Sequence, residues 1–191
     1  MKNTKSFVQT AFVAILAIIA ISFSSCSKKI IPTAINTVNA VGLSELNLER
    51  KDYKVLKTIS AEAIVKADIN EDKSVISEIN NEFEITYTKK GNGLFAQLFN
   101  PGANAERYEV KCKGIVKLGY LSNDYAREAL EDMCAEEIAI RTAKYRLINM
   151  AQQMGADGIV EPIISTNIEQ IGKEVIIKTT TQGKPIILKN D

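Results

Sequence analysis

Regular alternation of apolar and polar residues recurs along this chain and constrains its fold more than any other feature. From residue 53 to residue 67 every second residue is apolar, with Lys57 as the exception, and residues 83–88 and 108–118 repeat the pattern. Successive side chains on a strand point to opposite faces, so these stretches predict half-buried strands. Residues 69–80 between them are mostly polar and are interpreted as a loop.

One helical stripe follows these strands. Apolar and small residues recur at helical spacing over residues 126–154, Asn123 or the serine before it supplies an N-cap, and Gly155 ends the helix. Acidic residues interrupt the stripe and allow a break near 134–137. Leu147 lies in the middle of the stripe, so we expect it to be among the most buried residues.

Three short apolar runs end the chain. Residues 159–164, 175–177 and 186–188 are separated by glycines and predict a meander of strands, in which Pro162 marks an edge or an irregularity. The predicted fold class is therefore α+β: an antiparallel sheet packed on one long helix, in a single domain.

The first 25 residues have the pattern of an export signal. Lys2 and Lys5 form a basic start, and Ala11–Ile21 is an unbroken run of eleven apolar residues. Small residues, Ser24 and Ser25, then precede Cys26. The run fits the central region of a cleaved signal and is short for a membrane-spanning helix.

This signal sets the predicted domain organisation. Removing residues 1–25 from the 191 leaves 166, which is enough for one domain with a substantial core. Residues 26–50 show no sustained period and are expected to form a tether. Residues 51–191 are expected to form the α+β domain.

The cysteine at the cleavage site resembles that of a bacterial lipoprotein signal. Phe23-Ser24-Ser25-Cys26 is similar to the lipobox of Bacteroidota lipoproteins. The resemblance implies that Cys26 becomes the first mature residue and carries acyl chains, and two or more such chains hold a protein stably on a membrane. It also implies an envelope location, at the outer membrane facing the periplasm. The alternatives are an uncleaved anchor helix and an ordinary secretory signal with an incidental cysteine.

A second resemblance concerns the end of the predicted helix. Ala143, Leu147 and Ala151, at four-residue spacing, lead into Gly155-Ala156-Asp157-Gly158 and then an apolar strand. This run is similar to the helix-to-strand unit of small envelope lipoproteins, such as the Rcs stress-sensor lipoprotein. The segment Leu43–Leu48 with Asp52–Val55 also resembles uncharacterised Bacteroidota lipoproteins. These resemblances imply a fold type and an envelope location, and no functional residue.

Composition excludes several kinds of chemistry. The chain has no histidine, which excludes histidine-based triads and HExxH zinc sites. Beyond residue 25 there are 22 basic and 23 acidic residues, so nothing favours nucleic acid as a partner. No pattern indicates a cofactor or a metal site.

The two cysteines beyond Cys26 leave two alternatives open. Cys112 is expected to point inward from its strand, and Cys134 to lie near the inner stripe of the helix. A disulfide between them would join helix and sheet and contribute about 3 kcal/mol by the chain-entropy estimate. The other alternative is two buried, reduced thiols acting as small hydrophobic side chains.

An apolar run between glycines is a candidate contact loop for lipid or for a partner. Its apolar members are Leu94, Phe95, Leu98 and Phe99. The alternative is a satellite cluster that covers the sheet.

Acidic residues cluster on the predicted helix. These are Glu131, Asp132, Glu136 and Glu137. Paired carboxylates perform acid–base work in glycosidases, but such clusters more often form a solvated face, so no residue is assigned as catalytic.

The sequence therefore predicts a non-catalytic lipoprotein, attached to the membrane through the Cys26 lipid, that acts through contacts with an envelope protein. The alternative is a periplasmic module that binds a small lipid or glycan. It would require an apolar cavity lined by Phe95, Phe99 and aromatic residues of the sheet.

Overall fold

The computed structural model describes residues 31–41, 52–70, 72–90, 107–122, 124, 130 and 133–189, and all of these belong to the unit Ile31–Asp191. For Lys90, Arg107 and Tyr108 only the backbone is described. The strands are β1 (Thr33–Val41), β2 (Tyr53–Val55), β3 (Ile59–Ile69), β4 (Lys73–Glu78), β5 (Phe83–Lys90), β6 (Arg107–Gly114), β7 (Val116–Leu121), β8 (Gly158–Ile171) and β9 (Glu174–Leu188). In the described part of the chain, the helix is α3 (Ala135–Gln153).

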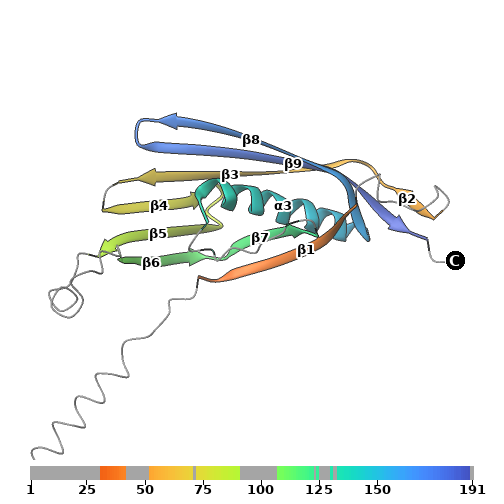
Figure 1. Ribbon diagram of the computed structural model, residues 1–191, viewed down its shortest axis with the longest axis horizontal. Coiled ribbons are helices and arrows are strands. Elements are labelled where there is room, and N and C mark those ends of the chain that lie inside the picture. Colours follow the sequence, from red (N-terminus) through yellow and green to blue (C-terminus); the bar gives the residue numbers. More distant parts are fainter. Residues whose placement is uncertain are drawn as a thin grey trace, which may run out of the picture. The chain divides into compact units, whose positions relative to one another are not determined.

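The strands form one mixed sheet that curves almost into a barrel. Their order is β6-β5-β4-β3-β9-β8-β1-β7, and β2 pairs with β9. Strands β6 and β7 stand at opposite ends of this order, yet Ile115 alone separates them in sequence. The chain therefore passes directly from one end of the sheet to the other, and α3 lies within the curve against β3, β7 and β9 (Figure 1).

The predicted antiparallel sheet on one long helix is wrong on two counts. Strand β1 pairs in parallel with both β7 and β8, so the sheet is mixed. The helix begins at Ala135 instead of near residue 123, because Cys134 adopts an extended backbone (φ −75°, ψ 163°). The acidic residues that interrupt the stripe, Glu136 and Glu137, stand in the first turn, where carboxylates favour the N-terminus of a helix.

Two strands lie where the sequence predicted a loop and a tether. Strand β4 occupies part of residues 69–80; its inward residues are Ile76 and Glu78, and the buried carboxylate hid the alternation. Strand β1 lies in the predicted tether, residues 26–50, and hydrogen-bonds with β7 and β8. Its Ile35 side chain is exposed, which obscured the period of two.

The long strand predicted over residues 108–118 is broken at Ile115. Gly114 has φ +79°, and a Cβ there would lie 2.1 Å from the backbone oxygen of Glu82, so this position favours glycine. The bend sends β6 to pair with β5 and β7 to pair with β1. The strand predicted over residues 53–67 is likewise divided, into β2 and β3.

The C-terminal meander consists of two long strands joined near Gly172. The irregularity predicted at Pro162 is confirmed, since the β8–β9 register shifts between Val160 and Ile163 and Glu161 has φ +50°. Beyond this bulge β8 leaves β1 and, among the described strands, continues beside β9 only.

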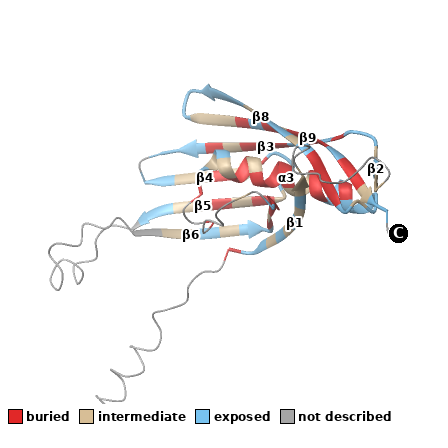
Figure 2. Ribbon diagram, turned by 45° about the vertical axis from the view of Figure 1, so that its right-hand side comes forward, coloured by how far each residue is buried: buried red, intermediate tan, exposed pale blue. Residues whose placement is uncertain are grey.

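The core lies between α3 and the strand faces that surround it, and Figure 2 shows buried residues on α3, β3, β5 and β9. Leu147 is 0% exposed, which confirms its predicted burial, and it packs in a cluster with Ile59, Leu121 and Ile159. Gly119 permits the closest approach of α3 to β7, because a Cβ there would lie 2.1 Å from the backbone nitrogen of Tyr145.

Candidate functional site

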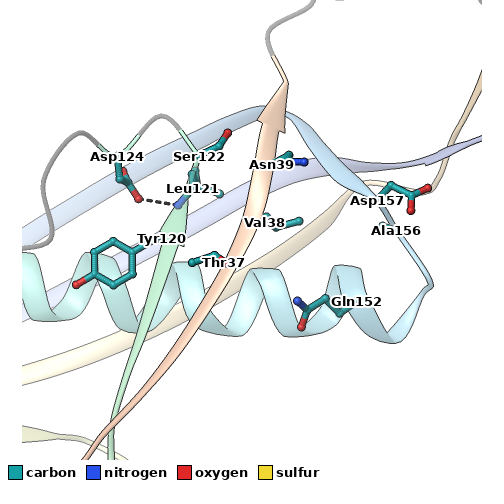
Figure 3. Close-up of a pocket in the computed structure, with 10 residues that line it drawn as sticks. All are labelled: Thr37, Val38, Asn39, Tyr120, Leu121, Ser122, Asp124, Gln152, Ala156 and Asp157. Carbon is teal, nitrogen blue, oxygen red and sulfur yellow. Dashed lines mark hydrogen bonds between the residues drawn. The ribbon is translucent and has the colours of Figure 1, made fainter.

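A polar cavity of about 480 Å³ lies where β7 and β1 end and α3 turns into β8. Its polar residues are Thr37, Asn39, Ser122, Asp124, Gln152 and Asp157. Figure 3 shows them arriving from β1, from the end of β7, from the last turn of α3 and from the turn before β8. The parallel pairing of β1 with β7 and β8 therefore brings together three regions that are far apart in sequence.

Hydrogen bonds fix several walls of this cavity. Gln152 and Asn36 exchange amide hydrogen bonds of 2.7 and 2.9 Å. The Ser122 hydroxyl accepts a bond from the Ala40 N–H at 2.9 Å, and the Asp157 carboxylate accepts one from the Leu188 N–H at 2.8 Å. Because these polar groups already bond within the protein, the cavity has a defined shape before any ligand enters.

A buried ion cluster lies beside the cavity, and Asp124, which lines the cavity, stands at its centre. The Asp124 carboxylate accepts bonds from the Lys144 ammonium at 2.8 Å and from the Leu121 N–H at 2.6 Å. The Arg141 guanidinium pairs with Asp124 and Glu137, both at 2.5 Å. It also lies over the Tyr120 ring, 4.4 Å from the centroid.

This cluster is balanced in charge and mostly removed from water. The Lys144 and Arg141 side chains are 7% and 11% exposed, and two carboxylates face two cations. Removing one partner of a buried ion pair lowers the stability of the fold strongly, because it leaves a buried charge without a counter-charge. The cluster therefore holds the backbone after β7 against α3, and its cations compensate the charge of the Asp124 carboxylate that lines the cavity.

A second surface feature is the distal edge of β8, which we define as Ile163–Ile171. In this segment β8 pairs with β9, whereas its pairing with β1 ends at Val160. Exposure is high for its four isoleucines: Ile163 63%, Ile164 39%, Ile168 52% and Ile171 56%. A long strand edge with exposed apolar side chains is a ready template for pairing with another chain.

Of the candidate sites predicted from sequence, only the two later cysteines and part of the acidic cluster fall within the described residues. Cys26 and the contact loop, with Leu94, Phe95, Leu98 and Phe99, lie outside the described residues, as do Glu131 and Asp132. Glu136 is exposed on the first turn of α3, and Glu137 pairs with Arg141.

The disulfide, one of the two alternatives for the later cysteines, is not formed in the structure. Cys112 and Cys134 are free thiols, Cys112 half-buried on β6 and Cys134 exposed before α3. The alternative of two buried thiols therefore fits Cys112 in part and does not fit Cys134.

We expect the two thiols to differ in reactivity. Burial raises the pKa of the Cys112 thiol, so its reactive thiolate forms only at higher pH than for an ordinary cysteine. Maleimide labelling followed by mass spectrometry should modify Cys134 first at neutral pH and Cys112 more slowly, with the Cys112 rate rising as pH increases. In denaturant the two should react alike. Equal rates in the native protein, or protection of both thiols until reduction, would contradict this expectation.

Sequence reasoning missed the cavity residues and the ion cluster. It placed Asp124 in the first turn of a helix, whereas Asp124 lies in the turn after β7 and its carboxylate bonds to Leu121. One local signal was present, because Glu137 and Arg141 are spaced i, i+4 on a helix. Nothing local linked this pair to residues on β1.

Among the described residues, no group of acidic or cysteine side chains has an arrangement that would hold a metal ion. In the same part of the chain, no helix is long and apolar enough to cross a membrane.

No protein-family model, curated protein or solved structure matches this chain.

Proposed function

We propose that this chain is a lipoprotein of a bacterial cell envelope, anchored through Cys26, whose barrel-like domain is non-catalytic and acts by binding another protein. Support for the anchor comes from the sequence alone: the basic start, the apolar run and the Phe23–Cys26 lipobox pattern. Ser27-Lys28-Lys29 after the cysteine has neither the aspartate of the familiar inner-membrane retention signal nor the acidic run of a surface-export signal, which favours the outer membrane with the domain facing the periplasm. Acyl chains on Cys26 would hold the domain at the membrane without a spanning helix.

The observation that carries the proposed binding role is the distal edge of β8. Proteins usually protect strand edges with lysine, proline, bulges or a covering element. Here the bulge and Pro162 stand before the edge, and the nine residues that follow contain one charged residue, Glu169. Recognition by strand addition uses an edge of this kind: the backbone supplies hydrogen bonds, and alternate side chains supply specificity.

A second candidate function is the binding of a small polar ligand in the cavity beside β1. The predicted alternative named a lipid or a glycan, and the polar lining favours a sugar over an acyl chain. Mass spectrometry of small molecules that co-purify with the protein would test this candidate. A wild-type preparation without bound ligand that also fails to bind envelope glycans would reject it.

The binding role is tested by photo-crosslinking of the full-length protein in cells. A photoreactive residue at Ile168 should form adducts with another protein, whereas the same residue at Ile115 should form none. The control is matched, because the Ile168 side chain is 52% exposed and the Ile115 side chain is 51% exposed. Ile168 lies on β8, and Ile115 lies between β6 and β7. Absence of adducts at Ile168, or equal adducts at both positions, would reject the binding role.

The anchor is tested in the same cells. Labelled palmitate should enter the wild-type protein, which should sediment with membranes, and Cys26→Ser should remove both the label and the sedimentation. A soluble and unlabelled wild-type protein would reject the anchor and leave the crosslinking result to be judged separately.

A further inference from the structure

We infer that the protein bound by the distal edge of β8 is a second copy of this chain, paired antiparallel with Asn167 on the two-fold axis. This inference rests on the proposed binding role of that edge and names its partner.

The edge is long and uncovered in the part of the chain that the structure describes. After Val160 the only strand that pairs with β8 is β9, and Figure 1 shows the β8–β9 hairpin continuing beyond the end of β1. Exposed isoleucines occur on both faces of the strand. Ile163 and Ile171 share the face opposite α3, while Ile164 and Ile168 lie on the face that carries the buried Ile177 of β9. Water therefore contacts apolar side chains on both sides of an unpaired backbone.

Paired with a reversed copy of itself, the edge brings two of its four isoleucines together on the outer face. In antiparallel pairing about Asn167, Ile163 stands opposite Ile171 of the second copy, and Ser165 stands opposite Glu169. On the other face, Thr166 stands opposite Ile168 and Ile164 stands opposite Gln170. Directly opposite residues are the pairs that stabilise or destabilise a sheet, and no like charges meet in this register.

This register also uses the edge completely. A two-fold axis at Asn167 pairs all nine residues from Ile163 to Ile171. An axis at Thr166 would pair Ile164 with Ile168, but it would place Ile163 opposite Glu169 and would leave the last two residues of the edge without partners. A shift of the axis toward the hairpin would leave Ile163 without a partner residue. An isologous contact of this kind closes after two copies, so it covers the edge without building a filament.

The test is cysteine crosslinking of the full-length chain in membranes, with Cys112→Ser and Cys134→Ser removing background thiols. Asn167→Cys lies opposite itself, about 5 Å away between Cβ atoms, so a short thiol crosslinker should produce a covalent dimer. Ser60→Cys is the matched control, since Ser60 is equally an exposed strand residue of the same sheet and should produce no dimer.

The register is tested by mixing two variants. Ile163→Cys alone should give no dimer, because the two copies of residue 163 would lie about 27 Å apart along the strands. The same is expected for Ile171→Cys alone. Co-expression of the two variants should give the dimer, because each residue then faces its partner.

The outcomes separate this inference from the proposed function. The expected pattern, a dimer from Asn167→Cys and from the mixed pair only, supports the second copy. Crosslinking of Asn167→Cys to a different protein would overturn the second copy and leave the binding role intact. Dimers from every variant would indicate random collision and would also overturn it. If neither Asn167→Cys nor the photoreactive residue at Ile168 forms a crosslink, both the second copy and the binding role are rejected.

Discussion

Replacing Leu147 by aspartate should leave the domain unfolded. Leu147 is 0% exposed on the middle of α3, in contact with residues of the sheet that surrounds the helix. An aspartate there would bury a carboxylate with no cation beside it in that apolar cluster, at a cost comparable to the whole stability of a domain. Far-UV circular dichroism and the recovery of protein from cells would show the loss of structure.

Leu147→Ala measures the packing contribution without adding a charge. We expect it to lower the free energy of unfolding by about 2–5 kcal/mol, through lost transfer free energy and the cavity that remains. The control is Met150→Ala, one turn along the same helix but 37% exposed, which should cost much less. Urea unfolding of the three proteins gives both values. A Leu147→Ala protein that unfolds with the wild-type midpoint would show that α3 is not packed as the structure places it.

Alternation identified those strands whose inward residues are apolar throughout. Strands β3 and β5 fit this description, since their inward residues are buried aliphatics, alanines and Phe83. It failed for β4, where the inward Glu78 is 1% exposed and bonds to Arg146 at 2.7 Å. A buried ion pair looks like a polar position in sequence, and its partner lies 68 residues away.

The helix was predicted too long because periodicity does not show where a helix begins. Leu130 and Met133 fit the stripe and are buried, but they precede α3. The start is set by the extended Cys134 and by the acidic first turn, which the sequence reading took for an interruption. Side chains on both sides of α3 are buried, including Arg141 and Lys144, so the helix is not amphipathic in the simple sense that a stripe assumes.

The near-closure of the sheet and the cavity could not be predicted, because both depend on pairing between distant segments. Closure requires the bend at Gly114 and the pairing of β1 with β7, and β1 lies in the segment that resembled a tether. The cavity forms only once β1 has brought Thr37 beside Ser122 and Asp157. The residue types that line the cavity do not reveal it in the sequence, because Thr, Asn and Ser are common on any protein surface.

Replacing Asp124 by alanine should destabilise the domain by about 3 kcal/mol or more. The change removes the carboxylate that pairs with both Arg141 and Lys144, and these side chains are only 11% and 7% exposed. Glu137 still compensates Arg141, but no ion pair to a second carboxylate is seen for Lys144 among the described residues. Loss of one partner from a buried ion pair typically costs 3–5 kcal/mol, on the order of a third of a domain's stability.

The cause of this loss can be isolated with a double-mutant cycle. If the cost arises from a stranded cation, Lys144→Met should remove part of it, so that Asp124→Ala with Lys144→Met is less destabilised than the two single changes added together. The control is Glu62→Ala, which removes a carboxylate from an exposed ion pair with Lys178 and should change stability by less than about 1 kcal/mol. Additive effects in the cycle would show that the cost does not arise from a stranded Lys144, so that it would come from Arg141 or from the lost bond to the Leu121 N–H. The Asp124–Lys144 pair would then not be the reason that the turn after β7 is held against α3.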